Sequence, residues 1–438
     1  MKRIVVVGGG AGGLELVSRL GRKYRRREDV EITLVDAAER HLWKPLLHEV
    51  ATGFMDIGAD ALEYRAHALK NGYRYCFGEM QGVDRDRREI ELAPLFGSKG
   101  QALLPVRHIP YDYLVLAVGS VSNDFGTPGV AQNCITLDSS SQAVKLHEQL
   151  TEELLRFSGT HSAEPVTVAI VGGGATGVEL AAVQHHVIEV LKKYAPSGVE
   201  GLASAPVQRF LKITLVEAGP RLLPPLPESI SAKALQTLQE LGVDVRVSTQ
   251  ITEATSEGLI TRDGELIPAC IMVWAAGVKG ANFLRDLAGL ETGRNNQLVV
   301  TETLQTTRDP AVFAIGDCAS RAMGDGRFVP PRAQSAHQMA DNCYRNLVAL
   351  ERDGAAKLQP YHYKDMGSLV NLARYKTLGA MMGPFATREI FVEGLLARLA
   401  YLSLYRMHQI ALHGYLRTVY FMWAGRIHRT VRRMIKLH

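Results

Sequence analysis

One short glycine-rich segment occurs twice in this chain, each time directly after an apolar run. The first copy is Val5-Val6-Val7-Gly8-Gly9-Gly10-Ala11-Gly12-Gly13, and the second is Ala169-Ile170-Val171-Gly172-Gly173-Gly174-Ala175-Thr176-Gly177. Both contain the G-x-G-x-x-G spacing typical of a strand, a tight turn and a helix that together bind a dinucleotide. A single copy is weak evidence, but two copies in the same local context predict an α/β protein with two Rossmann-like dinucleotide-binding domains.

The glycines have separate tasks in this pattern. The first permits the tight turn, the second lets the backbone approach a pyrophosphate, and the third lets the helix pack closely on the strand. The N-terminus of the helix then offers free N–H groups to the phosphates. The predicted phosphate-binding positions are Gly8, Gly10, Gly12 and Gly13 in the first copy, and Gly172, Gly174 and Gly177 in the second.

Each copy is followed by a strand that ends in an acidic residue. Asp36 lies 23 residues after Gly13, close to the offset of about 20 expected for a carboxylate that binds the adenosine ribose. Glu217 lies 40 residues after Gly177, so the second unit carries an insertion, which we place at Lys192–Phe210. Glu217 would repel a 2′-phosphate, which favours NADH over NADPH. Two such units predict two dinucleotides meeting face to face, as when a nicotinamide passes hydride to a flavin.

Small residues also follow other apolar strands. The strand Tyr111–Val118 ends in Gly119, a related turn contains Gly277, and the strand Val312–Ile315 is followed by Gly316-Asp317. Glycine at these turns lets the backbone approach a bound cofactor closely. Asp317 suits a contact with ribityl hydroxyls or a pyrophosphate, although a Gly-Asp pair is equally compatible with a simple turn.

Length and composition are those of a globular protein of two or three domains. The chain has 438 residues, of which 46% are hydrophobic and 22% charged. No apolar leader follows Met1-Lys2-Arg3, and no apolar stretch is long enough to span a bilayer, so neither a signal peptide nor a spanning helix is expected. The five cysteines are scattered, which indicates free thiols in a reducing compartment and predicts no metal site: Cys76, Cys134, Cys270, Cys318 and Cys343.

The basic charge is concentrated in the C-terminal tail. From Gly394 to His438 the chain has eight Arg or Lys and no acid, whereas the remaining residues carry 42 basic and 45 acidic side chains. From Tyr415 onward apolar residues recur at helical spacing: Leu416, Val419, Tyr420, Trp423, Ile427, Val431 and Met434. This pattern predicts an amphipathic helix lying in the plane of an anionic membrane surface. The preceding stretch Leu395–Leu412, which is also apolar and basic, is expected to form a second such helix. The alternative for the tail is an ordinary packing helix or a basic nucleic-acid-binding segment.

These features together resemble the two-dinucleotide-binding-domain flavoproteins. Within them, the chain closely resembles the type II, non-proton-pumping NADH:quinone oxidoreductases. The residues that carry this resemblance are both glycine motifs, the segment His41–Gly53, Ala314–Asp317, the Ala-Gln-x-Ala-x-Gln segment Ala333–Gln338, and the basic tail.

The resemblance implies the placement of the cofactors and the domains. FAD would be held by the first fold, through Gly8, Gly10, Gly12, Gly13, Asp36, Lys44, Gly119, Gly316 and Asp317. NADH would be held by the second fold, through Gly172, Gly174, Gly177, Glu217 and Gly277. The FAD-binding domain would comprise residues 1–160 and 300–345, the NADH-binding domain residues 161–299 inserted in it, and the membrane-anchoring region residues 346–438.

The resemblance also implies residues at the reaction site. Gln334 and Gln338 would line the quinone pocket beside the flavin ring, where their amides can donate to a quinone carbonyl. Their spacing of four places both on one helix face, as it would for a capping or surface role. Glu179 could orient the nicotinamide or relay a proton, or it could be a first-turn acid stabilised by the helix dipole, as Glu15 is at the equivalent place in the first repeat.

The expected partners are NADH, a membrane quinone and an anionic membrane surface, with no nucleic acid; whether a homodimer forms stays open. The expected location is the cytoplasmic face of the cell inner membrane, as a peripheral protein. The nearest alternative is a sulfide:quinone oxidoreductase, for which Cys318 is one candidate cysteine without an evident partner. A dithiol reductase is disfavoured because no close cysteine pair exists, and a redox-sensing nucleotide-binding protein without turnover is the alternative from another class.

Overall fold

The computed structural model describes most of the chain, and the structural statements below concern these residues only. The described ranges are 1–55, 57–160, 164–183, 209–324, 326–352, 355–372, 376–382, 389–393, 395–420 and 422–423. The predicted insertion at Lys192–Phe210 and the basic residues after 423 lie almost entirely outside them.

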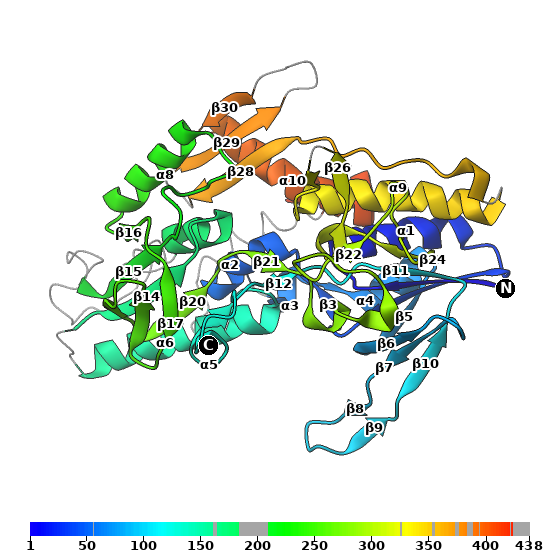
Figure 1. Cartoon of the computed structure of the whole chain (residues 1–438), viewed down its shortest axis with the longest axis horizontal. Helices are drawn as coiled ribbons and strands as arrows, with labels where there is room; N and C mark the ends of the chain where they lie inside the picture. Colours follow the sequence, from blue (N-terminus) through cyan, green and yellow to red (C-terminus); the bar gives the residue numbers. More distant parts are fainter. Residues whose placement is uncertain are drawn as a thin grey trace.

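The first glycine motif lies in a six-stranded sheet of order β23-β24-β11-β1-β2-β5, parallel except for the pair β23–β24. Its strands are β1 (Lys2–Val7), β2 (Val30–Asp36), β5 (Arg74–Phe77), β11 (Tyr113–Leu116), β23 (Gln305–Thr306) and β24 (Asp309–Ala314). The inner strands are continuous apolar runs because both faces of a parallel sheet are covered. Helices α1 (Ala11–Tyr24) and α9 (Ala333–Arg352) lie side by side over this sheet (Figure 1).

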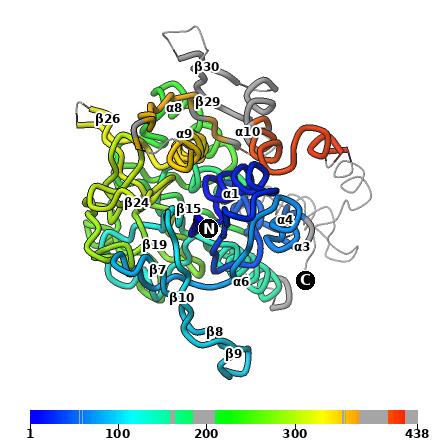
Figure 2. The backbone as a smooth tube through the Cα atoms, turned by 90° about the vertical axis from the view of Figure 1, so that its right-hand side faces the viewer, coloured from blue at the N-terminus to red at the C-terminus, as the bar shows by residue number. Residues whose placement is uncertain are grey.

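A small antiparallel sheet packs onto the same core through Met80, Ile90 and Leu92. Its strands are β6 (Met80–Asp84), β7 (Glu89–Leu92) and β10 (Arg107–Pro110). Between β7 and β10 a hairpin of β8 (Leu95–Phe96) and β9 (Ala102–Leu104) projects from the body (Figure 2).

The second glycine motif repeats this plan. Its sheet has the order β13-β20-β14-β15-β16 with all pairs parallel, and three antiparallel strands again accompany it. The parallel strands are β13 (Ile135–Thr136), β14 (Val166–Val171), β15 (Leu211–Val216), β16 (Asp244–Arg246) and β20 (Ile271–Trp274), and the antiparallel ones are β17 (Ile251–Ala254), β18 (Gly258–Thr261) and β19 (Leu266–Pro268). The helices are α6 (Ser140–Thr160), α8 (Glu228–Glu240) and residues 175–183. The predicted pair of nucleotide-binding folds is confirmed.

The domain boundaries differ from the predicted ones. β13 and α6 belong to the second fold, so the second fold begins well before residue 161. Leu284 and Leu287 already pack in the first core, so the chain returns before residue 300. The predicted boundary at residues 160 and 161 lies between α6 and β14, which both belong to the second fold. The chain passes between the two folds twice, and these two connections lie side by side, because β12 (Val121–Ser122) pairs with β21 (Val278–Lys279).

The C-terminal region begins inside α9, which runs across the predicted boundary at residues 345 and 346. It continues with an antiparallel sheet and a helix: β28 (Gly367–Leu372), β29 (Lys376–Met382), β30 (Glu389–Glu393) and α10 (Leu395–His413). Helix α10 contacts α1 and this sheet, and residues 415–420 are helical again after Gly414. Within the described part of the chain, no helix combines the length and the apolar character needed to cross a membrane.

Shorter elements connect these layers. They are β3 (Arg40–His41), η1 (Lys44–Leu46), α2 (Leu47–Ala51), α3 (Ile57–Asp60), β4 (Leu62–Glu63), α4 (Tyr64–Asn71), α5 (Val130–Asn133), η3 (Asn282–Leu284), η4 (Leu287–Gly289), β22 (Leu298–Val299), η5 (Gly316–Cys318), β25 (Ala319–Ser320), β26 (Ala322–Gly324), β27 (Arg327–Phe328) and η6 (Ala355–Lys357).

Candidate active site

The two glycine loops have nearly the same geometry. Gly8 has a φ of 101° and Gly172 a φ of 114°, a backbone conformation that residues with a side chain rarely adopt. A Cβ on Gly13 would lie 1.9 Å from the Gly8 carbonyl oxygen, and a Cβ on Gly177 would lie 2.0 Å from that of Gly172. The first and third glycines of each motif are therefore required by the turn and by the close approach of the helix.

The second glycine of each loop faces open space. A Cβ on Gly10 or on Gly174 would meet no described atom within 4 Å. The loop backbone is thus left accessible at the N-terminus of each following helix, where N–H groups point outward. A pyrophosphate fits this arrangement, and a side chain would fill the space it needs. Gly12 differs, because its missing side chain lets α9 approach, with the Ala336 carbonyl oxygen 3.1 Å from the Cβ position.

The two predicted acids bind the loops directly. Asp36 Oδ2 accepts a hydrogen bond from the Gly9 N–H at 2.6 Å, and Glu217 Oε2 accepts one from the Gly173 N–H at 2.6 Å. Glu217 Oε1 also accepts from the Gly219 N–H at 2.6 Å. Burial raises the pKa of Asp36, and the bonds from Gly9 and Ala38 oppose that shift. Each acid therefore fixes its own loop.

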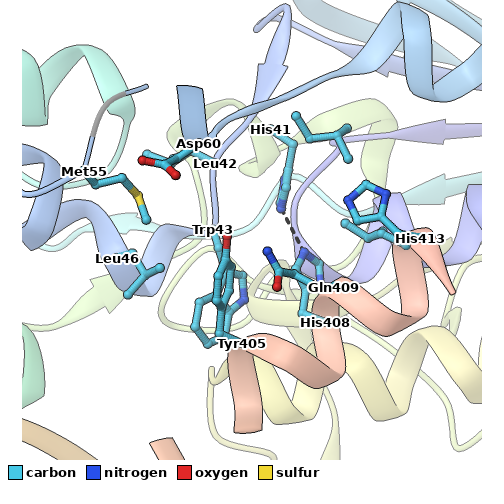
Figure 3. A pocket seen from close by; sticks show the side chains of 12 residues that line it. His41, Leu42, Trp43, Leu46, Met55, Asp60, Tyr405, His408, Gln409 and His413 are labelled. Carbon is cyan, nitrogen blue, oxygen red and sulfur yellow. Dashed lines mark hydrogen bonds between the residues drawn. The ribbon is translucent and has the colours of Figure 1, made fainter. Parts of the chain in front are cut away.

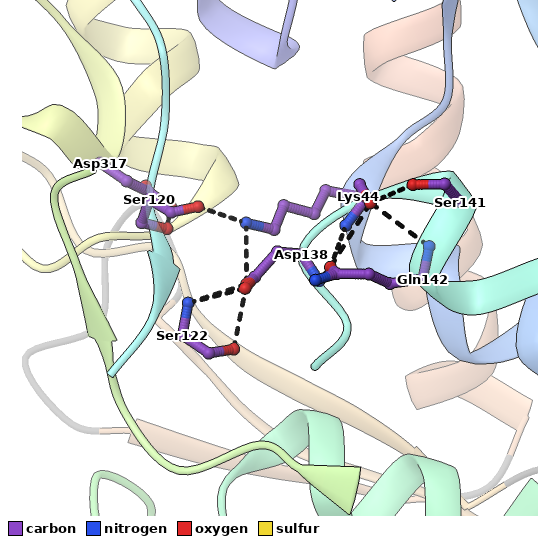
Figure 4. Close-up of polar contacts among 8 residues, drawn as sticks. Lys44, Ser120, Ser122, Asp138, Ser141, Gln142 and Asp317 are labelled. Atoms are coloured by element: carbon purple, nitrogen blue, oxygen red, sulfur yellow. Dashed lines mark hydrogen bonds and ion pairs between the residues drawn. The ribbon is translucent and has the colours of Figure 1, made fainter. Parts of the chain in front are cut away.

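A polar cluster forms at the carboxyl edge of the first sheet, beyond β11 and β24 (Figure 4). Lys44 Nζ donates to the Ser120 carbonyl oxygen at 2.7 Å and lies 3.8 Å from Asp138 Oδ1. The Ser120 hydroxyl donates to Asp317 Oδ2 at 2.8 Å. Burial raises the pKa of Asp317, and the positive charge of Lys44 offsets only part of this rise. The edge between adjacent parallel strands is where ligands bind in open α/β sheets.

The other predicted glycines lie around this edge. Gly119 and Gly316 have φ values of 74° and 72°, and both follow strands of the first sheet. Gly277 has a φ of 65° and directly precedes β21. A Cβ on Gly277 would lie 2.8 Å from the Phe125 ring. Gly119 has no described neighbour within 4 Å of its Cβ position, so it leaves room at the site.

Glu179 is buried where the two folds meet. Its Oε2 lies 3.6 Å from Nδ1 of His48, a residue of α2, whose neighbours Leu47 and Val50 pack into the core of the second fold. Burial lowers the pKa of His48 to about 4, so this imidazole is neutral at physiological pH. His48 Nε2 is buried without a hydrogen-bond partner among the described residues. An unpaired buried nitrogen at the junction of two nucleotide folds suits a ligand contact.

The side-chain amides of Gln334 and Gln338 form hydrogen bonds with the backbone of residues 364–367, which lead into β28. Gln334 donates to the Gly367 carbonyl oxygen at 3.0 Å and accepts from the Met366 N–H at 3.0 Å. Gln338 donates to the Lys364 carbonyl oxygen at 2.9 Å and accepts from the Lys364 N–H at 3.0 Å. The two glutamines therefore fix the segment 364–367 against α9, and their direct donation to a quinone stays a prediction.

Several residues at the site carried no recognisable sequence signal. Ser120 and Asp138 join Lys44, and His41 and Tyr64 bind the first loop. Their spacing in the chain follows no motif, because they meet only through the pairing of strands and helices distant in sequence. The segment His41–Gly53, singled out by resemblance, contains one of them, His41.

Comparison with known proteins separates the remaining alternatives. Residues 2–340 match the family model described as pyridine nucleotide-disulphide oxidoreductase. A type II NADH:quinone oxidoreductase of Haemophilus influenzae is 46% identical over 453 residues, covering 100% of both chains. This chain belongs to the type II NADH:quinone oxidoreductases. A Staphylococcus aureus enzyme of the same name is 27% identical over 397 residues, covering 89% of this chain and 92% of that protein.

Solved structures confirm the fold of this type II NADH:quinone oxidoreductase. NDH2 from Plasmodium falciparum in complex with NADH aligns with a TM-score of 0.76 at 17% identity, covering 97% of this chain and 99% of that one. The sulfide:quinone oxidoreductase of Aquifex aeolicus aligns with a TM-score of 0.71 at 17% identity, covering 94% and 92%. The fold is therefore shared with the main alternative, and the full-length relative decides between them.

Proposed function

We propose that this chain oxidises NADH and reduces a membrane quinone, with FAD held by the first fold. The observation that carries this proposal is the matched construction of the two loops, each open at its second glycine and each fixed by an acid, in a chain with a full-length relative of that name. FAD, when bound, accepts the hydride of NADH and passes two electrons to the quinone.

The first fold would hold FAD at three places. The loop from Gly8 to Gly13 and the start of α1 meet the pyrophosphate, and Asp36 meets the adenosine ribose. Asp317, oriented by Ser120, meets the ribityl chain or the pyrophosphate. Lys44 holds the Ser120 backbone in place and supplies a positive charge beside Asp317.

The second fold would hold NADH in the same way. Gly172 to Gly177 form the pyrophosphate loop, and Glu217 faces the ribose with its negative charge. A phosphate on that ribose would meet the carboxylate of Glu217, which supports NADH over NADPH.

The junction of the two folds would place the reacting groups. Glu179 and His48 lie there, buried and in contact, so they can orient the nicotinamide and exclude water. Gln334 and Gln338 would shape the quinone site by fixing the segment 364–367.

The exposed apolar residues after α10 support attachment to a membrane surface, where quinones are dissolved. Tyr415, Leu416, Val419, Tyr420 and Trp423 are all exposed. Exposed residues of this kind, beside a basic sequence, suit an in-plane anchor on anionic lipid. We propose the cytoplasmic face, where NADH is available.

Steady-state assay of the purified protein tests this function. NADH with a short-chain quinone should give turnover, and NADPH should be a much poorer donor. Turnover with sulfide in place of NADH would contradict the proposal and favour the alternative chemistry.

A further inference from the structure

A chain of hydrogen bonds links the C-terminal helix to the first glycine loop. Glu15 Oε1 on α1 lies 2.8 Å from His408 Nδ1 on α10, and His408 Nε2 lies 2.9 Å from His41 Nε2 (Figure 3). His41 Nδ1 lies 2.8 Å from the Gly9 carbonyl oxygen. Glu15, His408 and His41 are all buried. The N–H of the same glycine is held by Asp36. The two peptide groups on either side of the Gly9 Cα are therefore both held by hydrogen bonds from neighbouring elements.

The hydrogen-bond donors that link Glu15, His408, His41 and Gly9 can be counted. A carbonyl oxygen only accepts, so His41 Nδ1 must carry a hydrogen, and a neutral His41 then accepts at Nε2. The hydrogen between the two imidazoles must therefore belong to His408 Nε2. If Glu15 is ionised, it also needs a hydrogen from His408 Nδ1, which makes His408 an imidazolium. If His408 is neutral, Glu15 must carry the proton instead. In either case the complete series of hydrogen bonds needs one proton more than two neutral imidazoles and an ionised carboxylate carry.

The surroundings favour the ion pair. Burial alone would raise the pKa of Glu15, but hydrogen bonds from His337 and His408 outweigh it and lower that pKa. Burial lowers the pKa of His41 to about 3, which keeps this imidazole neutral and leaves its Nε2 as an acceptor. The half-exposed His337 lies on α9 with its Nδ1 at 2.5 Å from the second oxygen of Glu15, and this bond raises the pKa of His337.

Among the described residues, the loop of the second repeat has no such series of imidazole hydrogen bonds. There the carbonyl oxygen of Gly173, the equivalent of Gly9, accepts from the backbone N–H of Leu223 at 2.8 Å. A backbone amide does not titrate in the physiological range, whereas imidazoles do. The carbonyl oxygen of the first loop is thus held by an imidazole as well as by the Tyr64 hydroxyl, at a position where the second loop is held by a backbone bond.

We propose that the proton shared by Glu15 and His408 fastens α10 to the flavin-binding loop, so that loss of this proton weakens flavin binding. Glu15, His408 and His41 are then positioning residues for FAD, and the inference rests on the proposed function because it takes the first loop as the FAD site. Removing the proton leaves two lone pairs facing each other at one of three contacts: between Glu15 and His408, between the two imidazoles, or between His41 and Gly9. One link of the chain must then open.

The sign of the pH dependence follows from linkage. The fastened state binds one more proton than the opened state, so flavin binding is tightest at low pH and weakens as pH rises through the titration of the pair. Other titratable or charged groups face the pair or its partners from every neighbouring element: Arg19 and Arg22 on α1, Tyr64 and His67 on α4, His337 and Asp341 on α9, and His413 on α10.

The test measures the rate of FAD release from the holoenzyme by flavin fluorescence, from about pH 6 to about pH 10, around and above the usual histidine range. Release from the unchanged protein should become about tenfold faster as pH rises, the effect of losing one hydrogen bond to a charged group. Glu15→Gln, whose amide can donate to His408 Nδ1 as a protonated Glu15 would, should release FAD slowly at every pH, whereas His408→Gln should release it fast at every pH. Because two variants are tested, failure of one to fold leaves the other to decide.

His67→Gln is the matched control. His67 also joins α10 to the first fold, with Nε2 at 3.3 Å from the Leu412 carbonyl oxygen, but it has no link to the Gly9 loop. This variant should keep the pH dependence of the unchanged protein.

The outcomes separate the two proposals. A release rate of the unchanged protein that does not depend on pH would overturn the inference while leaving the FAD site intact. So would a pH dependence that survives in Glu15→Gln and His408→Gln. A protein that binds no flavin would overturn the proposed function and this inference with it.

Discussion

Glu217 combines a structural and a selective role at the second loop. Its two oxygens accept from the N–H groups of Gly173 and Gly219, so the side chain is fixed where a ribose would lie. Glu217→Gln keeps the shape but removes the charge and one acceptor. We expect kcat/KM for NADH to fall about tenfold and the ratio of NADPH to NADH use to rise. Steady-state kinetics with both nucleotides measure this, and Glu253→Gln, an exposed acid on β17, is the control. An unchanged ratio would contradict the assignment.

Cys318 follows Asp317, but its surroundings do not favour a reactive thiolate. It is fully buried within hydrogen-bond distance of the Leu116 and Ile315 carbonyl oxygens, and burial raises its pKa to about 11. The thiolate needed to attack sulfur is therefore scarce at neutral pH. Cys318→Ala should keep quinone turnover within about threefold while losing about 1 kcal/mol of stability. The exposed Cys270→Ala is the control. Loss of turnover in Cys318→Ala alone would show that the thiol takes part.

At the residue scale, the sequence predicted the groups that follow a local rule. The loop glycines and the two acids were found from spacing, because each depends on one strand, one turn and one helix. Ser120 and His41 were not singled out as site residues, because their partners Asp317 and His408 lie on other elements. Spacing could not show that Gln334 and Gln338 bind the backbone of residues 364–367.

Helix α9 and the segment 364–367 form one unit through the two glutamines. Gln338→Glu would set a carboxylate oxygen against the Lys364 carbonyl oxygen, which now accepts from the amide at 2.9 Å. We expect the KM for quinone to rise roughly tenfold, because a bond is replaced by repulsion. Reduction of the flavin by NADH should be unchanged. Stopped-flow and steady-state kinetics separate the two steps, with Gln239→Glu on the exposed face of α8 as control. An unchanged quinone KM would remove this unit from the quinone site.

The segment after α10 presents apolar residues to the outside. Leu416 is 84% exposed, although burial of one leucine is worth about 1.5–3 kcal/mol. Leu416→Glu should therefore weaken binding to anionic vesicles by at least about tenfold. Leu155→Glu, on α6 and 65% exposed, is the matched control and should leave binding unchanged. Sedimentation with vesicles measures both, and equal binding of the two variants would contradict the anchor.

At the element scale, most strands of the two sheets were predicted closely. Helix α1 ends at Tyr24, where the Arg27 N–H bonds to the Tyr24 carbonyl oxygen in a tighter turn. Helix α10 was predicted to lie on a membrane. It is in part a packing helix, because His408 and Leu412 are buried against the first fold. Amphipathic spacing alone does not distinguish a membrane from a protein surface.

The whole molecule places two similar nucleotide folds so that α2 of the first packs into the core of the second. The sequence predicted the insertion of one fold in the other but misplaced both boundaries. Strand β13 is two residues long and pairs with β20, more than a hundred residues later, so no local pattern could assign it. The pairing of β12 with β21, which connects the two folds, follows from this arrangement.

An anaerobic visible spectrum of the purified protein tests whether NADH reduces the flavin and quinone reoxidises it. NADH is added first, and a short-chain quinone second. We expect NADH to bleach the flavin absorbance and quinone to restore it, which establishes both half-reactions in one sample. Bleaching without recovery would contradict the quinone site. A flavin that NADH does not bleach would contradict the assignment of the second fold.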